Sequence, residues 1–121
     1  MNIFDDERDR PVIWIGSSRS DLANLPKPVK SSFGARLYEL QRGKRVRDSK
    51  PLSQFGPSVW ELRESYDKNA YRLMCVLALE RAIYVLHAFM KKSKRGIDLP
   101  RVDAALIASR LKVAQRLDRE S

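Results

Sequence analysis

Two long apolar segments separated by a charged pair constrain the fold of this chain more than any other feature. The first segment covers residues 71–79, the second covers residues 82–90, and Glu80 and Arg81 lie between them. Apolar segments of this length joined by a short turn predict a β-hairpin. The second strand runs into a series of cations that would lie at the rim of the sheet, namely Lys91, Lys92, Lys94 and Arg95.

Alternation along the second strand predicts which of its side chains share a face. If the strand continues unbroken, one face carries Ile83, Val85, His87, Phe89 and Lys91. Lys92 would then point away from that face or lie beyond the end of the strand.

The segments before the hairpin predict one strand, two helices and a further strand. Residues 12–15 form a short apolar strand, and a brief helix capped by Ser17 or Ser18 should end before Pro26. A longer helix opening at Pro28 should end near Gly43, because one apolar stripe runs along it, consisting of Val29, Phe33, Leu37 and Leu40. Residues 59–66 alternate as a strand, with Trp60, Leu62 and Tyr66 on one face and Glu61 and Arg63 on the other.

A final helix is predicted after Asp98, which can act as its N-cap. Its expected apolar stripe consists of Leu99, Val102, Leu106, Val113 and Leu117, supported by Ala105. The order of elements predicts an α+β domain with a mainly antiparallel four-stranded sheet, two N-terminal helices and one C-terminal helix.

Length and charge restrict the class of protein. A chain of 121 residues can form one small domain, which we place at 11–121 after a mobile acidic tail at 1–10. The first ten residues hold two basic and four acidic side chains, so the remainder carries 22 basic against 11 acidic residues, a formal charge of +11. A small domain this basic is expected to bind a polyanion, most often a nucleic acid.

Other classes are disfavoured by what the sequence contains. The acidic start differs from a secretory signal, and the apolar run from Leu73 to Leu79 is shorter than a membrane helix requires. With Cys75 and His87 as its single cysteine and histidine, the chain is not expected to bind a metal or another cofactor. We therefore expect a cytoplasmic protein without a membrane partner, in which Cys75 is a buried apolar residue.

Cleavage of RNA by its own 2′-hydroxyl is a reaction that a basic sheet could catalyse. Arginine and lysine can orient the phosphate and neutralise the charge that develops in the transition state. Arg72 is the first candidate, because a guanidinium can donate to two phosphate oxygens. The alternative is that Arg72 is a surface arginine paired with a neighbouring carboxylate such as Glu61 or Glu64.

Further cations could bind the RNA backbone. The segment 42–50 is either a solvated loop or a phosphate-contact surface, and its candidates are Arg42, Lys44, Arg45, Arg47 and Lys50. Lys94 and Arg95 follow the hairpin, and Phe89 could stack on a base, although core packing is the simpler interpretation. His87 is suited to proton transfer near neutral pH, with a structural role as the alternative.

An ordered set of short motifs extends over about 12–119. They are VIWIGSSR at 12–19, LP at 25–26, QRG at 41–43, KPL at 50–52, VWELR at 59–63, AYR at 70–72 and YVLHAFMKK at 84–92. In this order they resemble the RelE/ParE toxin superfamily, and its phage-derived, HigB-type branch in particular. The resemblance implies a RelE-like fold.

The resemblance also implies roles for individual residues. Arg72 matches the position of an arginine that contacts the scissile phosphate, and Lys91 matches a second catalytic cation, which a shift of one residue would move to Lys92. Arg63 lies where ribosome-dependent relatives carry a basic residue that can act as general base. An arginine can hardly accept a proton, so the identity of the base stays open.

The implied function is that of the toxin of a type II toxin–antitoxin system. It would be an endoribonuclease that cleaves messenger RNA on the ribosome and inhibits translation. Its partners would be messenger RNA, the ribosome and a cognate antitoxin, often a helix-turn-helix protein. The alternative is a non-enzymatic, ParE-like inhibitor or a nucleic-acid-binding phage-derived protein of the same fold.

Overall fold

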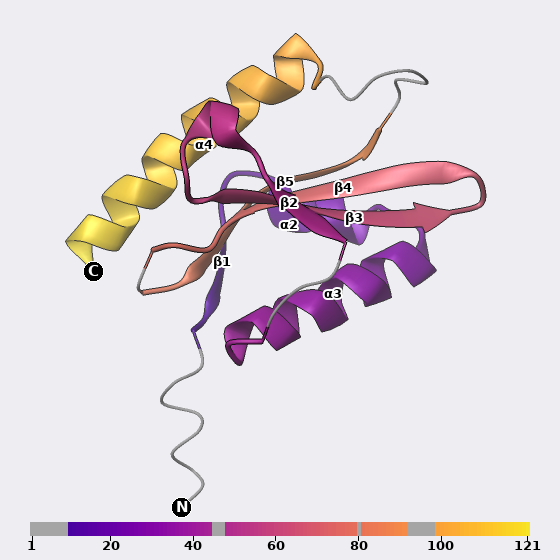
Figure 1. Cartoon of the computed structure of the whole chain (residues 1–121), viewed down its shortest axis with the longest axis horizontal. Helices are drawn as coiled ribbons and strands as arrows, with labels where there is room; N and C mark the ends of the chain where they lie inside the picture. The colour runs from indigo at the N-terminus through magenta and orange to yellow at the C-terminus, as the bar shows by residue number, and fades with distance from the viewer. Residues whose placement is uncertain (1–9, 45–47, 80, 92–98) are drawn as a thin grey trace, which may run out of the picture.

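A single sheet with helices on both faces forms the domain (Figure 1). The computed structural model describes residues 10–44, 48–79, 81–91 and 99–121. In chain order the elements are β1 (Val12–Trp14), α2 (Ser18–Ala23), α3 (Lys27–Gln41), β2 (Ser49–Pro51), the 3-10 helix η1 (Ser53–Phe55), β3 (Val59–Tyr66), β4 (Asn69–Val76), β5 (Ile83–Lys91) and α4 (Arg101–Glu120). The tail predicted at 1–10 lies outside the described residues except for Arg10.

The sheet has five strands rather than the predicted four, in the order β1-β5-β4-β3-β2. The α+β class is confirmed, and every neighbouring pair is antiparallel except β1 with β5. The sequence did not predict β2 or η1, because Ser49–Pro51 has no apolar alternation of its own. β2 forms through pairing with β3 at the edge of the sheet, where a proline is tolerated.

The predicted hairpin is formed by β4 and β5 at the centre of the sheet, which explains why both strands are so apolar. The turn predicted at Glu80-Arg81 cannot be compared in full, because Glu80 lies outside the described residues. The register shifts at a bulge: Val85 pairs with Cys75, whereas His87 pairs with Met74.

The bulge makes the predicted alternation of β5 wrong over its first half. Ile83 and Val85 enter the core beneath α3, whereas Phe89 packs in the core beneath α4. The extra residue in the bulged strand reverses the faces of all residues before it relative to those after it.

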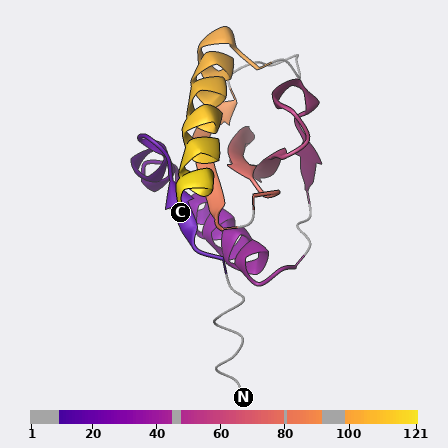
Figure 2. The ribbon, with the colours of Figure 1, turned by 90° about the vertical axis from the view of Figure 1, so that its left-hand side faces the viewer.

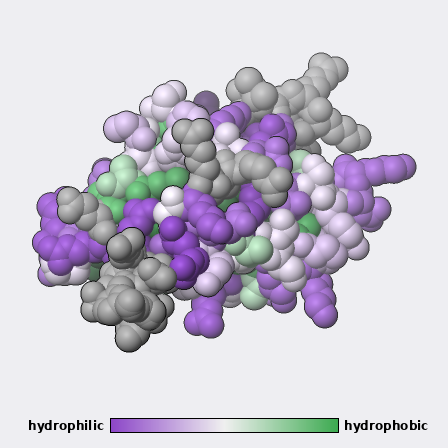
Figure 3. Space-filling model, turned by 60° about the horizontal axis from the view of Figure 1, so that its bottom comes forward, coloured by the Kyte–Doolittle hydropathy of each residue, from purple (hydrophilic) through white to green (hydrophobic). Residues whose placement is uncertain are grey.

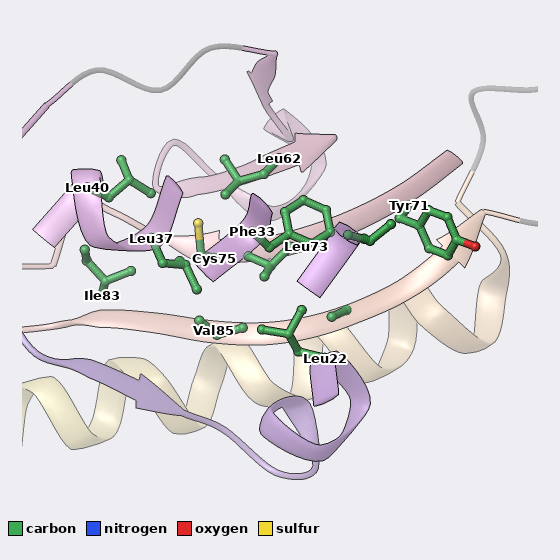
Figure 4. Close-up of a cluster of buried hydrophobic side chains, with 12 residues drawn as sticks. Leu22, Phe33, Leu37, Leu40, Leu62, Tyr71, Leu73, Cys75, Ile83 and Val85 are labelled. Carbon is green, nitrogen blue, oxygen red and sulfur yellow. The ribbon is translucent and has the colours of Figure 1, made fainter. Parts of the chain in front are cut away.

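The core between α3 and the sheet contains the stripe predicted for this helix (Figure 4). Val29, Phe33, Leu37 and Leu40 are all buried. Pro28 lies in the first turn of α3, and Gly43, just past its end, has a φ of 80° that favours glycine. The strands contribute Leu62, Leu73, Cys75, Ile83 and Val85 to this core.

The second core lies between the opposite face of the sheet and α4, which runs across β4 and β5 (Figure 2). The stripe predicted for the C-terminal helix is correct in part, because Leu99, Val113 and Leu117 pack against this core. Val102 is 80% exposed and Ala105 is exposed, whereas the buried side chains are those of Ile107, Leu111 and Ala114. Because the helix carries apolar residues around much of its circumference, tertiary contacts selected the buried face.

Polar contacts attach α4 to the sheet along its length. The guanidinium of Arg110 donates to the carbonyl oxygen of Leu86 at 2.8 Å, and the Tyr84 hydroxyl donates to Asp118 Oδ1 at 2.9 Å. Burial, followed by the hydrogen bond and the charge of Asp118, raises the pKa of Tyr84 to about 12.

The side of the molecule shown in Figure 3 is mainly hydrophilic, with apolar side chains in small separate patches. Within the described ranges, no helix is long and apolar enough to cross a membrane.

Candidate active site

Four cations from four adjacent strands lie on the face of the sheet that also receives α4. Lys50 comes from β2, Arg63 from β3, Arg72 from β4 and Lys91 from β5. The register places Lys50 opposite Glu61 and Arg63 opposite Arg72. We call these four cations together with Glu61 the cation cluster.

Arg72 and Glu61 form the buried centre of the cation cluster. Arg72 Nε lies 3.1 Å from Glu61 Oε2, and the side chains are 3% and 1% exposed. Within the described part of the chain, Arg72 Nε and the two Glu61 oxygens make no hydrogen bond of good geometry, so the contact is an ion pair. Of the two interpretations of Arg72 that the sequence allows, the ion pair with Glu61 is thus present in the structure.

Glu64, the other carboxylate considered for Arg72, lies on the opposite face of the sheet. Its Oε2 is 3.1 Å from Arg36 Nη1 of α3, and it accepts a hydrogen bond from Ser32 Oγ. Alternation along β3 therefore sends neighbouring carboxylates to different partners.

The outer part of the cation cluster is open to solvent. Lys50 Nζ lies 4.0 Å from Glu61 Oε1, and Arg63 Nε lies 3.8 Å from Glu61 Oε2. The side chains of Lys50 and Arg63 are 42% and 47% exposed, so both remain able to contact a polyanion. A cleft of about 480 Å³ adjoins them at the β2–β3 edge, lined by Asp48, Ser49, Lys50, Arg63, Glu64 and Ser65.

Lys91 has an altered acidity within the cation cluster. Desolvation lowers its pKa, and the positive charges of Arg72, Arg63 and Lys50 lower it further. The carboxylate of Glu61 acts in the opposite direction and raises the pKa. A lysine in such surroundings gives up its proton more readily than one in water.

Comparison with known proteins identifies the family. Residues 20–112 match the family described as phage derived protein Gp49-like, which is well over half of the chain. The chain belongs to the Gp49-like family.

A solved structure shows which fold the Gp49-like protein shares. The Gp49-like protein is similar to a double arginine-to-alanine variant of the Escherichia coli toxin RelE in the free state, with a TM-score of 0.56 and 13% sequence identity. The match covers 84% of this chain and 93% of that chain. The Gp49-like protein therefore shares the RelE fold. No curated protein matches the sequence significantly.

His87 of the Gp49-like protein lies in a polar contact between β5 and two helices. Its Nε2 is 2.7 Å from Asp103 Oδ1 of α4, and its Nδ1 is 3.9 Å from Asp21 Oδ2 of α2. Its ring stacks on Phe89 at a centroid distance of 4.6 Å. His87 is thus held by structural contacts, and one face of the Phe89 ring is already covered.

The segment predicted to bind RNA at 42–50 is divided between two places. Lys50 joins the cation cluster, whereas Arg42 and Lys44 lie at the end of α3. Arg42 lies over the ring of Tyr38, at 5.9 Å from its centroid. Lys44 lines a separate cleft of about 600 Å³ with Arg10, Leu40, Gly43, Ser49, Trp60 and Leu77.

Several candidates lie outside the described residues, namely Arg45, Arg47, Lys92, Lys94 and Arg95. Among the residues that the structure describes, no group of three or more His, Cys, Asp or Glu side chains is placed to hold a metal ion.

Cys75 is buried, and desolvation raises the pKa of its thiol to about 12.

Glu61 is the member of the cation cluster that the sequence did not single out as a site residue. Alternation had placed it on the same face as Arg63, but its burial depends on the neighbouring strands. The feature that sets the register of β3 against β4 is the two-residue turn Asp67-Lys68. It has positive φ at both positions and pairs Tyr66 with Asn69. Counting back from that turn sets Arg72 opposite Arg63, next to Glu61.

Proposed function

We propose that the Gp49-like protein is the toxin of a type II toxin–antitoxin pair, of HigB type, and that it cleaves messenger RNA on the ribosome. The observation that supports this most is the cation cluster, in which Lys50, Arg63, Arg72 and Lys91 surround one carboxylate on a RelE-like fold. Convergent cations on a sheet suit the transfer of a phosphoryl group within RNA.

In the proposed reaction the 2′-hydroxyl loses its proton to solvent water, its oxygen attacks the adjacent phosphorus, and the bond from phosphorus to the 5′ oxygen breaks. The products are a 2′,3′-cyclic phosphate and a 5′-hydroxyl. Arg63 and Lys50, which are exposed to solvent, would bind the phosphate directly. Arg72, which is buried in the sheet, would add positive charge beneath them. Lys91, with its lowered pKa, would give a proton to the departing 5′ oxygen.

The partners follow from the same charge. A basic surface suits messenger RNA, ribosomal RNA and an acidic segment of an antitoxin. We propose a helix-turn-helix antitoxin that covers the cation cluster in the cytoplasm. His87 and Phe89 would support the site through packing rather than chemistry.

A non-enzymatic, ParE-like inhibitor is the second candidate, and one observation favours it. Arg72 is 2% exposed and ion-paired, as expected of an arginine that serves the fold. In that case the cluster would bind an acidic target without cutting RNA.

Induced expression followed by mapping of transcript 5′ ends distinguishes the two candidates. We expect new 5′ ends in messenger RNA that vanish when translation is blocked. Lys91→Ala and Arg63→Ala should abolish most of the cuts. Lys112→Ala is the matched control, because Lys112 is an exposed lysine on α4 outside the cluster. If growth stops while transcripts stay intact, the nuclease proposal is wrong.

A further inference from the structure

Glu61 is a fully buried carboxylate in a strand, between Trp60 and Leu62. Burying a carboxylate costs several kcal/mol even when it is paired, and an apolar residue of similar volume is often the more stable choice. Packing alone therefore does not account for a glutamate at this position.

The two oxygens of Glu61 connect cations that would otherwise repel one another. Oε2 lies 3.1 Å from Arg72 Nε and 3.8 Å from Arg63 Nε, and Oε1 lies 4.0 Å from Lys50 Nζ. Arg63 and Arg72 are direct cross-strand partners, an arrangement that is unfavourable for like charges. One carboxylate thus holds together side chains from β2, β3 and β4.

We propose that Glu61 is a positioning residue for RNA cleavage, which sets the spacing of Arg72, Arg63 and Lys50 without touching the substrate. This inference rests on the proposed function. Glu61 itself is inaccessible, so its effect must pass through the cations around it. Its negative charge also raises the pKa of Lys91 against the lowering by the neighbouring cations.

The isosteric substitution Glu61→Gln separates this role from a purely structural one. It removes the charge, so the cations should move apart and the pKa of Lys91 should fall further. If Lys91 acts as the acid, cleavage declines as Lys91 loses its proton, and this alkaline decline should then begin at a lower pH. A variant that is merely less stable loses activity without moving that decline.

Glu64→Gln provides the matched control. Glu64 is a nearby carboxylate of β3 whose ion pair has the same length, 3.1 Å, but it faces Arg36 on the other side of the sheet. Its substitution should leave the pH profile unchanged. Glu61→Asp keeps the charge and moves it back by one methylene, so its pH profile should stay near that of the wild type.

The experiment measures single-turnover cleavage of messenger RNA on programmed ribosomes from mildly acidic to alkaline pH. We expect Glu61→Gln to slow cleavage by roughly 10- to 100-fold, since a misplacement of about 1 Å can cost on the order of 100-fold, and to move the alkaline decline to lower pH. A rate equal to or above that of the wild type, or an unmoved decline, would overturn the inference.

A second measurement does not depend on activity. The titration of Lys91, followed by NMR of its labelled side chain, should shift to lower pH in Glu61→Gln and stay unshifted in Glu64→Gln. If Glu61→Gln fails to fold, Glu61→Asp provides the test. It must cleave more slowly than the wild type, and its Lys91 must titrate at the same pH as in the wild type. If the wild type cuts no RNA, the proposed function fails; the Lys91 titration then reports separately whether Glu61 controls the charge of the cluster.

Discussion

Replacing Arg72 by methionine should destabilise the protein far more than breaking an ion pair at the surface would. Methionine replaces the apolar stem of the arginine side chain but has no charge. The substitution therefore leaves Glu61 buried without its partner at 3.1 Å. Arg63 and Lys50 remain at 3.8 and 4.0 Å, but both are almost half exposed, so solvent screens their charges. Removal of one member of a buried pair costs about 3–5 kcal/mol, which is the loss we expect.

The double variant Arg72→Met, Glu61→Leu removes both charges and should recover most of the stability. Apolar replacement of a complete buried pair is often neutral or stabilising by about 1–4 kcal/mol. The free energy of unfolding is measured in urea by circular dichroism for the wild type, both single variants and the double variant. The four values give the coupling energy between the two side chains.

The pair Arg36–Glu64 provides the comparison that isolates burial. Its separation is also 3.1 Å, but its side chains are 13% and 26% exposed. We expect a coupling energy of about 1 kcal/mol there, against several for Arg72–Glu61. Equal coupling in the two pairs, or a loss below about 1 kcal/mol in Arg72→Met, would refute burial as the source of the effect.

Three further predictions concern the cores. Ile107→Ala should cost about 2–5 kcal/mol in urea unfolding, whereas Val102→Ala, on the exposed side of α4, should cost less than about 0.5. Cys75, with a pKa of about 12, should resist a thiol reagent at neutral pH until the protein is unfolded. Tyr84 has its pKa raised from 10.0 to about 12, so folding holds its proton. The contribution of Tyr84 to the free energy of unfolding is therefore complete below pH 10 and declines as the pH rises toward 12. Tyr84→Phe should lessen this decline when the free energy of unfolding is measured at alkaline pH.

Local periodicity was enough to predict most of the elements. The stripe from Val29 to Leu40 specified both α3 and its buried face, because residues four apart on a helix lie side by side whatever surrounds them. Alternation in β3 likewise placed Leu62 on one face and Glu61 with Arg63 on the other. The two apolar segments that contain most of β4 and β5 predicted the hairpin that these strands form.

Other features depend on partners that are distant in the chain. Ser49–Pro51 becomes a strand only because β3 offers it an edge, and the bulge opposite Met74 reverses the faces of β5 only once β4 is paired. The rotation of α4 was settled in the same way. Its sequence permits more than one apolar face, and the sheet buries the face that carries Ile107.

The candidate site shows the same division between sequence and tertiary structure. The sequence by itself determined that Arg63, Arg72 and Lys91 are cations on neighbouring strands, since alternation and charge are local properties. Only the tertiary structure decided that Arg72 is buried against Glu61 and that Lys50 joins them from an unpredicted strand. Burial and electrostatic coupling depend on the distances between strands, and those distances exist only after the sheet has assembled.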